Sequence, residues 1–145
     1  MQTRADSVAR WLFLTGALVT SAHLTAAELA PCPASPNCVS SKADAQDSHY
    51  VEPLQGQGSR SDSMTALQSV LNALPRVSTE RKAEDHLQAV FTSRIFRFKD
   101  DVDFVVDETG KIDVRSASRV GYSDLGANRS RVEMLREKLS DLPEE

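Results

Sequence analysis

The stretch FRFKDDVDFVVDETGKIDVRSASRV, residues 96–120, decides the fold. Over residues 96–107 apolar and polar side chains alternate, which is typical of a β-strand with one buried face. The DETG sequence at residues 107–110 is typical of a tight hairpin turn whose glycine takes the left-handed conformation. We therefore predict a hairpin with a return strand from residue 111 to about 120. The buried face of the first strand is predicted to carry Phe96, Phe98, Val102, Phe104 and Val106.

A three-residue loop would fix the register of this hairpin. It places Asp103 opposite Arg115 and Asp100 opposite Ser118. Asp100 breaks the alternation, because an unbroken strand would point it into the apolar face, where an unpaired carboxylate is costly. We expect either a bulge or turn that re-aims Asp100, or a cation or several hydrogen-bond donors that meet it.

Two helices are predicted from apolar residues at three- and four-residue spacing. The first begins at a cap among residues 61–63 and ends at Pro75. The second lies near the C-terminal end and begins between residues 128 and 130, or earlier if Asp124 caps it.

Shorter alternating patterns predict further strands at residues 49–54, 76–79 and 87–98. Together the elements indicate a single domain over residues 48–142. We predict an α+β fold, an antiparallel sheet of about four to five strands with two helices, in the order β-α-β-β-β-α.

Residues 1–27 are typical of a secretory signal peptide. Arg4 and Arg10 precede the apolar run WLFLTGALV, and small residues allow cleavage between Ala22 and Ala27. The alternative is a retained anchor, but the apolar stretch falls short of the ~20 residues that a span needs. We therefore expect an exported protein, periplasmic or extracellular, without a membrane span after cleavage.

Cys32 and Cys38 lie close together in CPASPNC, and an oxidising compartment favours a disulfide between them. Residues 28–47 are predicted to form an arm that this disulfide clips. A metal site is not expected, because His49 and His86 are far apart and show no ligand spacing. No cofactor is expected either.

The balance of charge limits the classes of partner. The chain has 145 residues and a formal net charge of −4. A mildly acidic protein repels a phosphate backbone, so we expect no nucleic acid among its partners.

Residues 115–131, RSASRVGYSDLGANRSR, gather four arginines and four serines between a strand and a helix. Arginine side chains and backbone amides at a helix start can hold an anion. We predict that this cluster binds a small anionic ligand or an envelope protein. The candidate residues are Asp100, Asp101, Arg115, Ser116, Ser118, Arg119, Asp124, Asn128 and Arg129. The alternative is that the arginines only neutralise nearby aspartates in a structural network.

Catalysis has a weaker basis in the sequence. A serine, a histidine and an acid could be drawn from Ser116 or Ser118, His49 or His86, and Asp100, but no local motif indicates it. We therefore predict a non-catalytic binding module of the cell envelope, with an envelope hydrolase using the same cluster as the alternative.

Four blocks, in order along the chain, resemble the domain-of-unknown-function family numbered 1499, found in bacteria and plants. They are CPASPNCVSS from residue 32, HYVEP from 49, FRFKDDVDF from 96 and RSASRVGYSDLGANRSRVE from 115. The resemblance covers residues 32 to about 139 and implies a small exported or organelle-lumen domain. It brings no activity, substrate or catalytic residue to carry over. The family's typical tryptophan in the first helix has no counterpart here.

Overall fold

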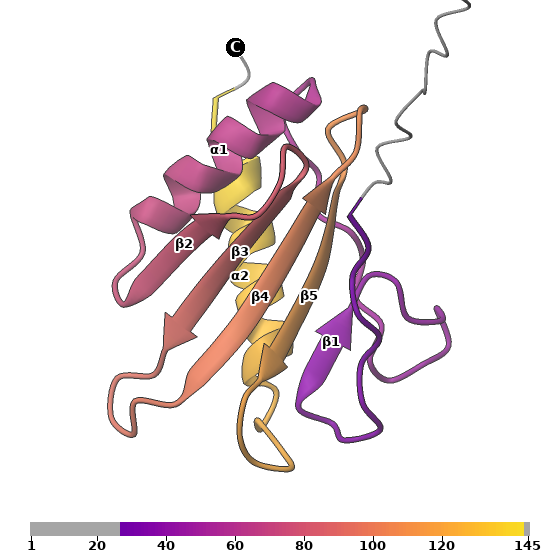
Figure 1. Ribbon diagram of the computed structural model, residues 1–145, viewed down its shortest axis with the longest axis vertical. Helices are drawn as coiled ribbons and strands as arrows, with labels where there is room; N and C mark the ends of the chain where they lie inside the picture. Colours follow the sequence, from indigo (N-terminus) through magenta and orange to yellow (C-terminus); the bar gives the residue numbers. More distant parts are fainter. Residues whose placement is uncertain (1–26, 144–145) are drawn as a thin grey trace, which may run out of the picture.

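A computed structural model describes residues 27–143, which form a five-stranded antiparallel sheet and two helices (Figure 1). The elements are β1 (Cys38–Ser40), α1 (Arg60–Asn72), β2 (Val77–Arg81), β3 (His86–Thr92), β4 (Lys99–Val106), β5 (Ile112–Ser118) and α2 (Ala127–Ser140). The predicted α+β class is confirmed, as is the order of a strand, a helix, a run of strands and a final helix. The predicted signal peptide lies outside the described residues, apart from its last residue.

The sheet has the strand order β1-β5-β4-β3-β2. Strands β2 to β5 follow one another as a meander, and β1 pairs with the free edge of β5. The hairpin of β4 and β5 has the predicted register, with Asp103 opposite Arg115 and Asp100 opposite Ser118. Gly110 has a φ of 84°, the left-handed conformation expected of the turn.

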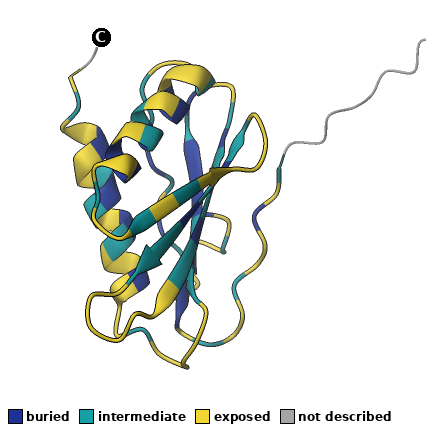
Figure 2. Ribbon diagram, turned by 60° about the vertical axis from the view of Figure 1, so that its left-hand side comes forward, coloured by how far each residue is buried: buried dark blue, intermediate teal, exposed yellow. Residues whose placement is uncertain are grey.

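The hydrophobic core lies between one face of the sheet and the two helices (Figure 2). Because side chains alternate along a strand, Val102, Phe104 and Val106 of β4 all point into it and are fully buried. Leu67 of α1 and Leu135 of α2 are likewise fully buried against this face. The apolar stripes of both helices therefore serve packing.

Helix α1 begins earlier than predicted. Its N-cap is Ser59, whose side chain accepts from the backbone amide of Asp62, and the Asp62 carboxylate accepts from Ser59 in return. The hydrogen bond from the Ser59 hydroxyl lowers the pKa of Asp62. The cap predicted among residues 61–63 is wrong, because the chain already turns into the helix at Gly58, which has a φ of 64°.

The first strand is also displaced from its predicted position. Residues 49–54 do not form a strand; Tyr50 and Leu54 make only isolated bridges, and Pro53 removes a backbone donor between them. The edge strand is β1, within the predicted arm, and it is held by ladder bonds to β5. The predicted disulfide is confirmed: Cys32 is bonded to Cys38, the first residue of β1.

The predicted apolar face of β4 is wrong at its first two residues. Phe96 and Phe98 are exposed, because β3 ends at Thr92 and the chain forms a loop over residues 93–98. In this loop the amide of Ser93 donates to the Phe98 carbonyl, and the Phe98 amide donates to the Ser93 hydroxyl. The alternation in the sequence continues through residues that are not part of the strand.

Candidate functional site

Asp100, the residue that breaks the alternation of β4, is met by a cation. It points to the core face, as the register predicts, and its carboxylate lies 2.5 Å from the guanidinium of Arg131 on α2. Both side chains are nearly buried, with 13% and 12% of their surface exposed. Arg131 also lies over the ring of Phe91, 4.8 Å from its centroid. Arg131 was not among the predicted site residues.

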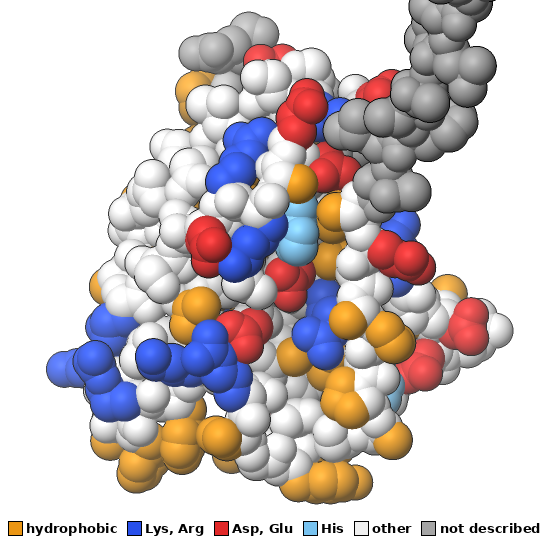
Figure 3. Space-filling view, viewed as in Figure 1, with side chains coloured by type: hydrophobic (Ala, Val, Ile, Leu, Met, Phe, Trp, Pro, Cys, Tyr) orange, Lys and Arg blue, Asp and Glu red, His pale blue; other side chains and the backbone are white. Residues whose placement is uncertain are grey.

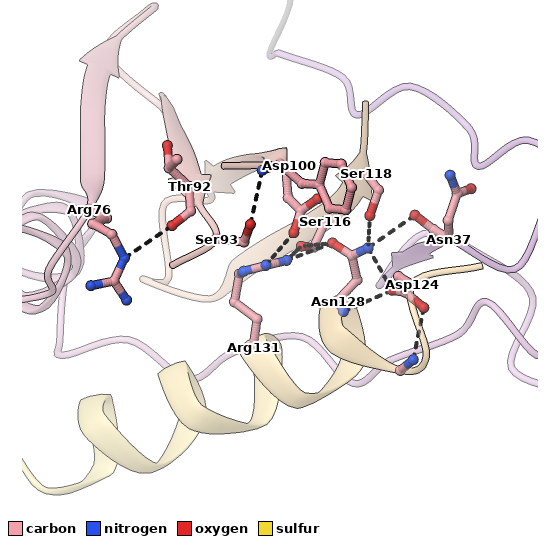
Figure 4. Close-up of polar contacts among 12 residues, drawn as sticks. Asn37, Arg76, Thr92, Ser93, Asp100, Ser116, Ser118, Asp124, Asn128 and Arg131 are labelled. Atoms are coloured by element: carbon pink, nitrogen blue, oxygen red, sulfur yellow. Dashed lines mark hydrogen bonds and ion pairs between the residues drawn. The ribbon is translucent and has the colours of Figure 1, made fainter. Parts of the chain in front are cut away.

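Asn128, in the first turn of α2, is the centre of this polar cluster (Figure 4). Its side chain is fully buried. The Oδ1 atom accepts from the Ser116 hydroxyl at 2.6 Å and from Arg131 at 2.7 Å. The two hydrogens of the Nδ2 group are shared among three acceptors, the Asn37 carbonyl, the Ser118 hydroxyl and the Asp124 carboxylate. Arg131 can only donate and Asp124 can only accept, so the chemistry of the neighbours fixes the orientation of the amide.

Asp124 holds the start of α2, which begins at Ala127, one residue before the predicted range. Its carboxylate accepts from the backbone amides of Gly126 and Asn128, at 2.9 Å in both cases. Partial burial acts to raise the pKa of Asp124, but these amide bonds and the Asn128 side chain outweigh it, so that the pKa is lowered. The longer helix capped by Asp124 does not form, because the N-cap of α2 is Gly126 in the left-handed conformation. Asp124 instead accepts from the backbone amide of Asn128, within the first turn of the helix.

The outer face of the hairpin carries a second ion pair. Arg119 binds Asp101 through two parallel hydrogen bonds of 2.7 and 2.8 Å, and this contact raises the pKa of Arg119. Asp103 does not pair with Arg115, although the two are opposite in register. It instead accepts from Gln88 and lies 3.0 Å from Nε2 of His86 on β3.

Arg115 and Arg129 contact the N-terminal part of the chain. Arg129 donates to the carbonyls of Ser48 and Tyr50, and so clamps that loop to α2. It lines a small hollow of about 170 Å³ together with Asp124 and residues of the N-terminal segment. Arg115 makes one long contact, 3.5 Å, with the Pro31 carbonyl, and its Nε is buried without a partner.

The structure thus divides the predicted site residues. Five of them, together with Arg131, share one buried or half-buried network: Asp100, Ser116, Ser118, Asp124 and Asn128. Asp101 and Arg119 form a separate pair on the outer face, while Arg115 and Arg129 contact the N-terminal segment. Their role in holding a ligand stays a prediction.

Neither histidine lies against a serine hydroxyl in the described part of the chain. His49 places Nδ1 2.7 Å from Asp47 and Nε2 3.1 Å from the Ser35 carbonyl. The bond to Asp47 raises the pKa of His49, which favours the protonated ring. Over residues 27–143, moreover, no three histidine, cysteine, aspartate or glutamate side chains gather as a metal site would require.

Sequence reasoning missed a group of cations beside this cluster. Arg94, Arg97 and Lys99 lie in or next to the β3–β4 loop, and Arg76 donates to the carbonyl of Thr92 at the start of that loop. All four are exposed, and none forms an ion pair within residues 27–143. The signal was present: residues 93–99, SRIFRFK, hold three cations and no acid.

A comparison with protein-family models matches residues 28–139 to the family described as "Protein of unknown function (DUF1499)". The chain belongs to the DUF1499 family. The match includes the disulfide, the whole sheet and nearly all of α2, so the polar network described above lies inside the DUF1499 domain. A comparison with curated proteins finds no match. In residues 27–143 neither helix has the length and apolar character needed to cross a bilayer.

Proposed function

We propose that this DUF1499 protein is a non-catalytic binding module of the cell envelope, which holds an anionic partner at one end of its sheet. The observation that carries the proposal is the group of unpaired cations, Arg76, Arg94, Arg97 and Lys99, at that end. An exposed cation without an acidic neighbour is free to meet an anion, whereas one in an ion pair must first lose its partner. The chain as a whole has a net charge of −4, so this end differs in sign from the rest.

The buried network has a supporting part in this proposal. Asn128 and Arg131 use their donors and acceptors on neighbouring side chains, which leaves little capacity for a ligand. The network instead ties the start of β4 to the start of α2, and so fixes the two loops at this end of the sheet. Arg119, which is 45% exposed, lies beside these loops, but its guanidinium is already held by Asp101.

The proposed location rests on the disulfide. A bond between Cys32 and Cys38 is compatible with export, since such bonds persist in oxidising compartments.

An envelope hydrolase is the alternative, and it has less support from the geometry. Hydrolysis by a serine needs a base within hydrogen-bond reach of the hydroxyl. The Ser116 hydroxyl donates to Asn128 and accepts from Arg131, and His86 is engaged with Asp103 on the outer face.

The experiment is retention on a heparin column, with heparin as a soluble sulfated polyanion. We expect the double variant Arg94→Gln, Arg97→Gln to elute at clearly lower salt than the wild type. The matched control is Lys82→Gln, Lys111→Gln, which removes the same charge at the other end of the sheet, where both lysines already have acidic partners. Equal elution of both double variants would contradict the proposal.

A further inference from the structure

The exposed apolar side chains of this protein are concentrated in two loops. Within residues 27–143, all six large hydrophobic side chains that stand exposed belong to the β3–β4 loop or to the segment between β5 and α2, and between 53% and 96% of their surface is accessible. They are Ile95, Phe96, Phe98, Val120, Tyr122 and Leu125. Figure 3 shows hydrophobic side chains along the lower edge of the molecule, with basic side chains beside them.

Both loops lie at the same end of the sheet. The last ladder pair between β4 and β5 joins Asp100 to Ser118, and just beyond it the Arg119 amide donates to the Lys99 carbonyl at 3.1 Å. Figure 1 shows the two loops projecting together from this end. Apolar side chains that are distant in sequence thus protrude from the same end of the sheet, in two loops.

The loops hold their apolar side chains in defined positions. The rings of Phe96 and Phe98 stack with centroids 5.5 Å apart. Arg97, between the two phenylalanines in the sequence, has a φ of 59°, and Leu125 in the other loop has a φ of 53°. Both values fall in the left-handed region, which non-glycine residues adopt rarely. The polar network beneath the loops fixes their ends at β4 and α2. A protein that only had to be soluble would gain nothing from exposing stacked aromatic rings in this way.

Basic side chains lie among the exposed apolar side chains of the β3–β4 loop. In SRIFRFK the cations Arg94, Arg97 and Lys99 alternate with the apolar residues. The opposite end of the sheet, formed by the β2–β3 and β4–β5 turns, carries acidic residues. These are Glu84, Asp85, Asp107 and Glu108. The cations Arg81, Lys82 and Lys111 also lie at that end, where Lys82 pairs with Glu80 and Lys111 with Asp107. Charges of both signs are thus mixed there, whereas residues 93–99, beside the exposed apolar side chains, hold cations and no acid.

We propose that the β3–β4 and β5–α2 loops dock onto the surface of an anionic lipid bilayer; this inference rests on the proposed function and names its partner. Aromatic and aliphatic loop tips enter the boundary between headgroups and acyl chains, where Tyr and Phe rings are favoured. Arginine and lysine side chains between them reach back to lipid phosphates. A bilayer surface offers acyl chains and phosphates side by side, so apolar and cationic side chains must lie next to each other to bind it. The sequence SRIFRFK alternates the two kinds of side chain.

The test is sedimentation with vesicles of 30% phosphatidylglycerol and 70% phosphatidylcholine, compared with pure phosphatidylcholine. We expect binding to the first and much weaker binding to the second. Arg94→Gln, Arg97→Gln should weaken vesicle binding about five-fold for each cation removed, while Lys82→Gln, Lys111→Gln leaves it unchanged.

A second variant separates lipid insertion from simple attraction of anions. Ile95→Ser, Phe96→Ser removes the two most exposed apolar side chains of the β3–β4 loop, and we expect an unchanged melting temperature because neither contributes to the core. Vesicle binding should fall at least ten-fold, whereas retention on heparin should stay as in the wild type.

Three outcomes would overturn the inference. If heparin retention depends on Arg94 and Arg97 but the protein does not bind the anionic vesicles, lipid is not the partner, although the proposed function stands. If Ile95→Ser, Phe96→Ser binds vesicles as the wild type does, the loop tips do not insert. If neither heparin nor vesicles distinguish the charge variants, both the inference and the proposed function fail.

Discussion

Replacement of Asn128 by alanine should destabilise the protein strongly, because this buried amide joins five partners. It accepts from Ser116 and Arg131 and donates to Asn37, Ser118 and Asp124. A neutral hydrogen bond contributes about 1 kcal/mol net, and one to a charged group about 1.5–3 kcal/mol.

The full sum of these values is not expected, because most partners keep another contact. The Asn37 carbonyl still accepts from the Ser118 amide, and the Asp124 carboxylate still accepts from two backbone amides. Arg131 keeps its bonds to Asp100 and Ser116. We therefore expect the free energy of unfolding to fall by about 3 kcal/mol. For a domain of this size the melting temperature should fall by about 12 °C.

Thermal melts and urea titrations followed by circular dichroism would measure this loss. The matched control is Asn72→Ala, which removes an exposed asparagine at the end of α1 whose side chain bonds only Gln68. We expect that control to lie within about 0.5 kcal/mol of the wild type. If Asn128→Ala melts within about 2 °C of Asn72→Ala, the cluster does not hold the fold, and its side chains are better explained as ligand contacts.

Three further predictions concern the same region. Arg131→Met keeps apolar contact with Phe91 but leaves the Asp100 carboxylate unpaired near the core, so urea titration should show a loss of about 2–3 kcal/mol; no loss would show that water already satisfies Asp100. The folded-state pKa of Asp124 is lowered, so its contribution to stability is present above the ordinary carboxyl pKa and is lost as the pH falls through the folded-state value. The gap in stability between the wild type and Asp124→Asn should therefore narrow as the pH is lowered below the ordinary carboxyl pKa, and a constant gap would refute this. Reduction of the Cys32–Cys38 disulfide should release two thiols that label only after reduction, and thiols that label without it would contradict the bond. Because the closed loop is short, reduction should lower the free energy of unfolding by only about 2 kcal/mol.

The hairpin was predictable because its two determinants are local in the sequence. The alternation over residues 102–106 sets which face is buried, and the turn at 107–110 sets the register, so the pairing of Asp100 with Ser118 followed directly. The need for a partner to Asp100 also followed, because the register placed a carboxylate against the core. The sequence did not reveal that this partner is Arg131, since that depends on how α2 is rotated over the sheet.

Other features depend on contacts between distant segments. Asp103 and Arg115 are opposite in register, yet Asp103 contacts His86, because β3 lies on the other side of β4 and offers a partner there. Strand β1 is only three residues long and shows no readable period; it forms because the free edge of β5 satisfies its backbone. Phe96 and Phe98 continue the alternation of β4 but lie in a loop, which no periodicity argument detects.

The position of the polar network explains how an exposed apolar surface can be maintained on a small domain. Loops are usually mobile, and apolar loops at a sheet end would tend to collapse onto the core or associate with other chains. Here Arg131 crosses from α2 to Asp100 at the start of β4, and Asn128 bonds to Ser116 and Ser118 of β5. The Asp100 carboxylate and the Asn128 amide exclude apolar side chains from this end of the core, because an aromatic ring that displaced them would leave the charges of Asp100 and Arg131 buried and unpaired. The same network that stabilises the fold therefore keeps the neighbouring apolar side chains at the surface, available to a partner.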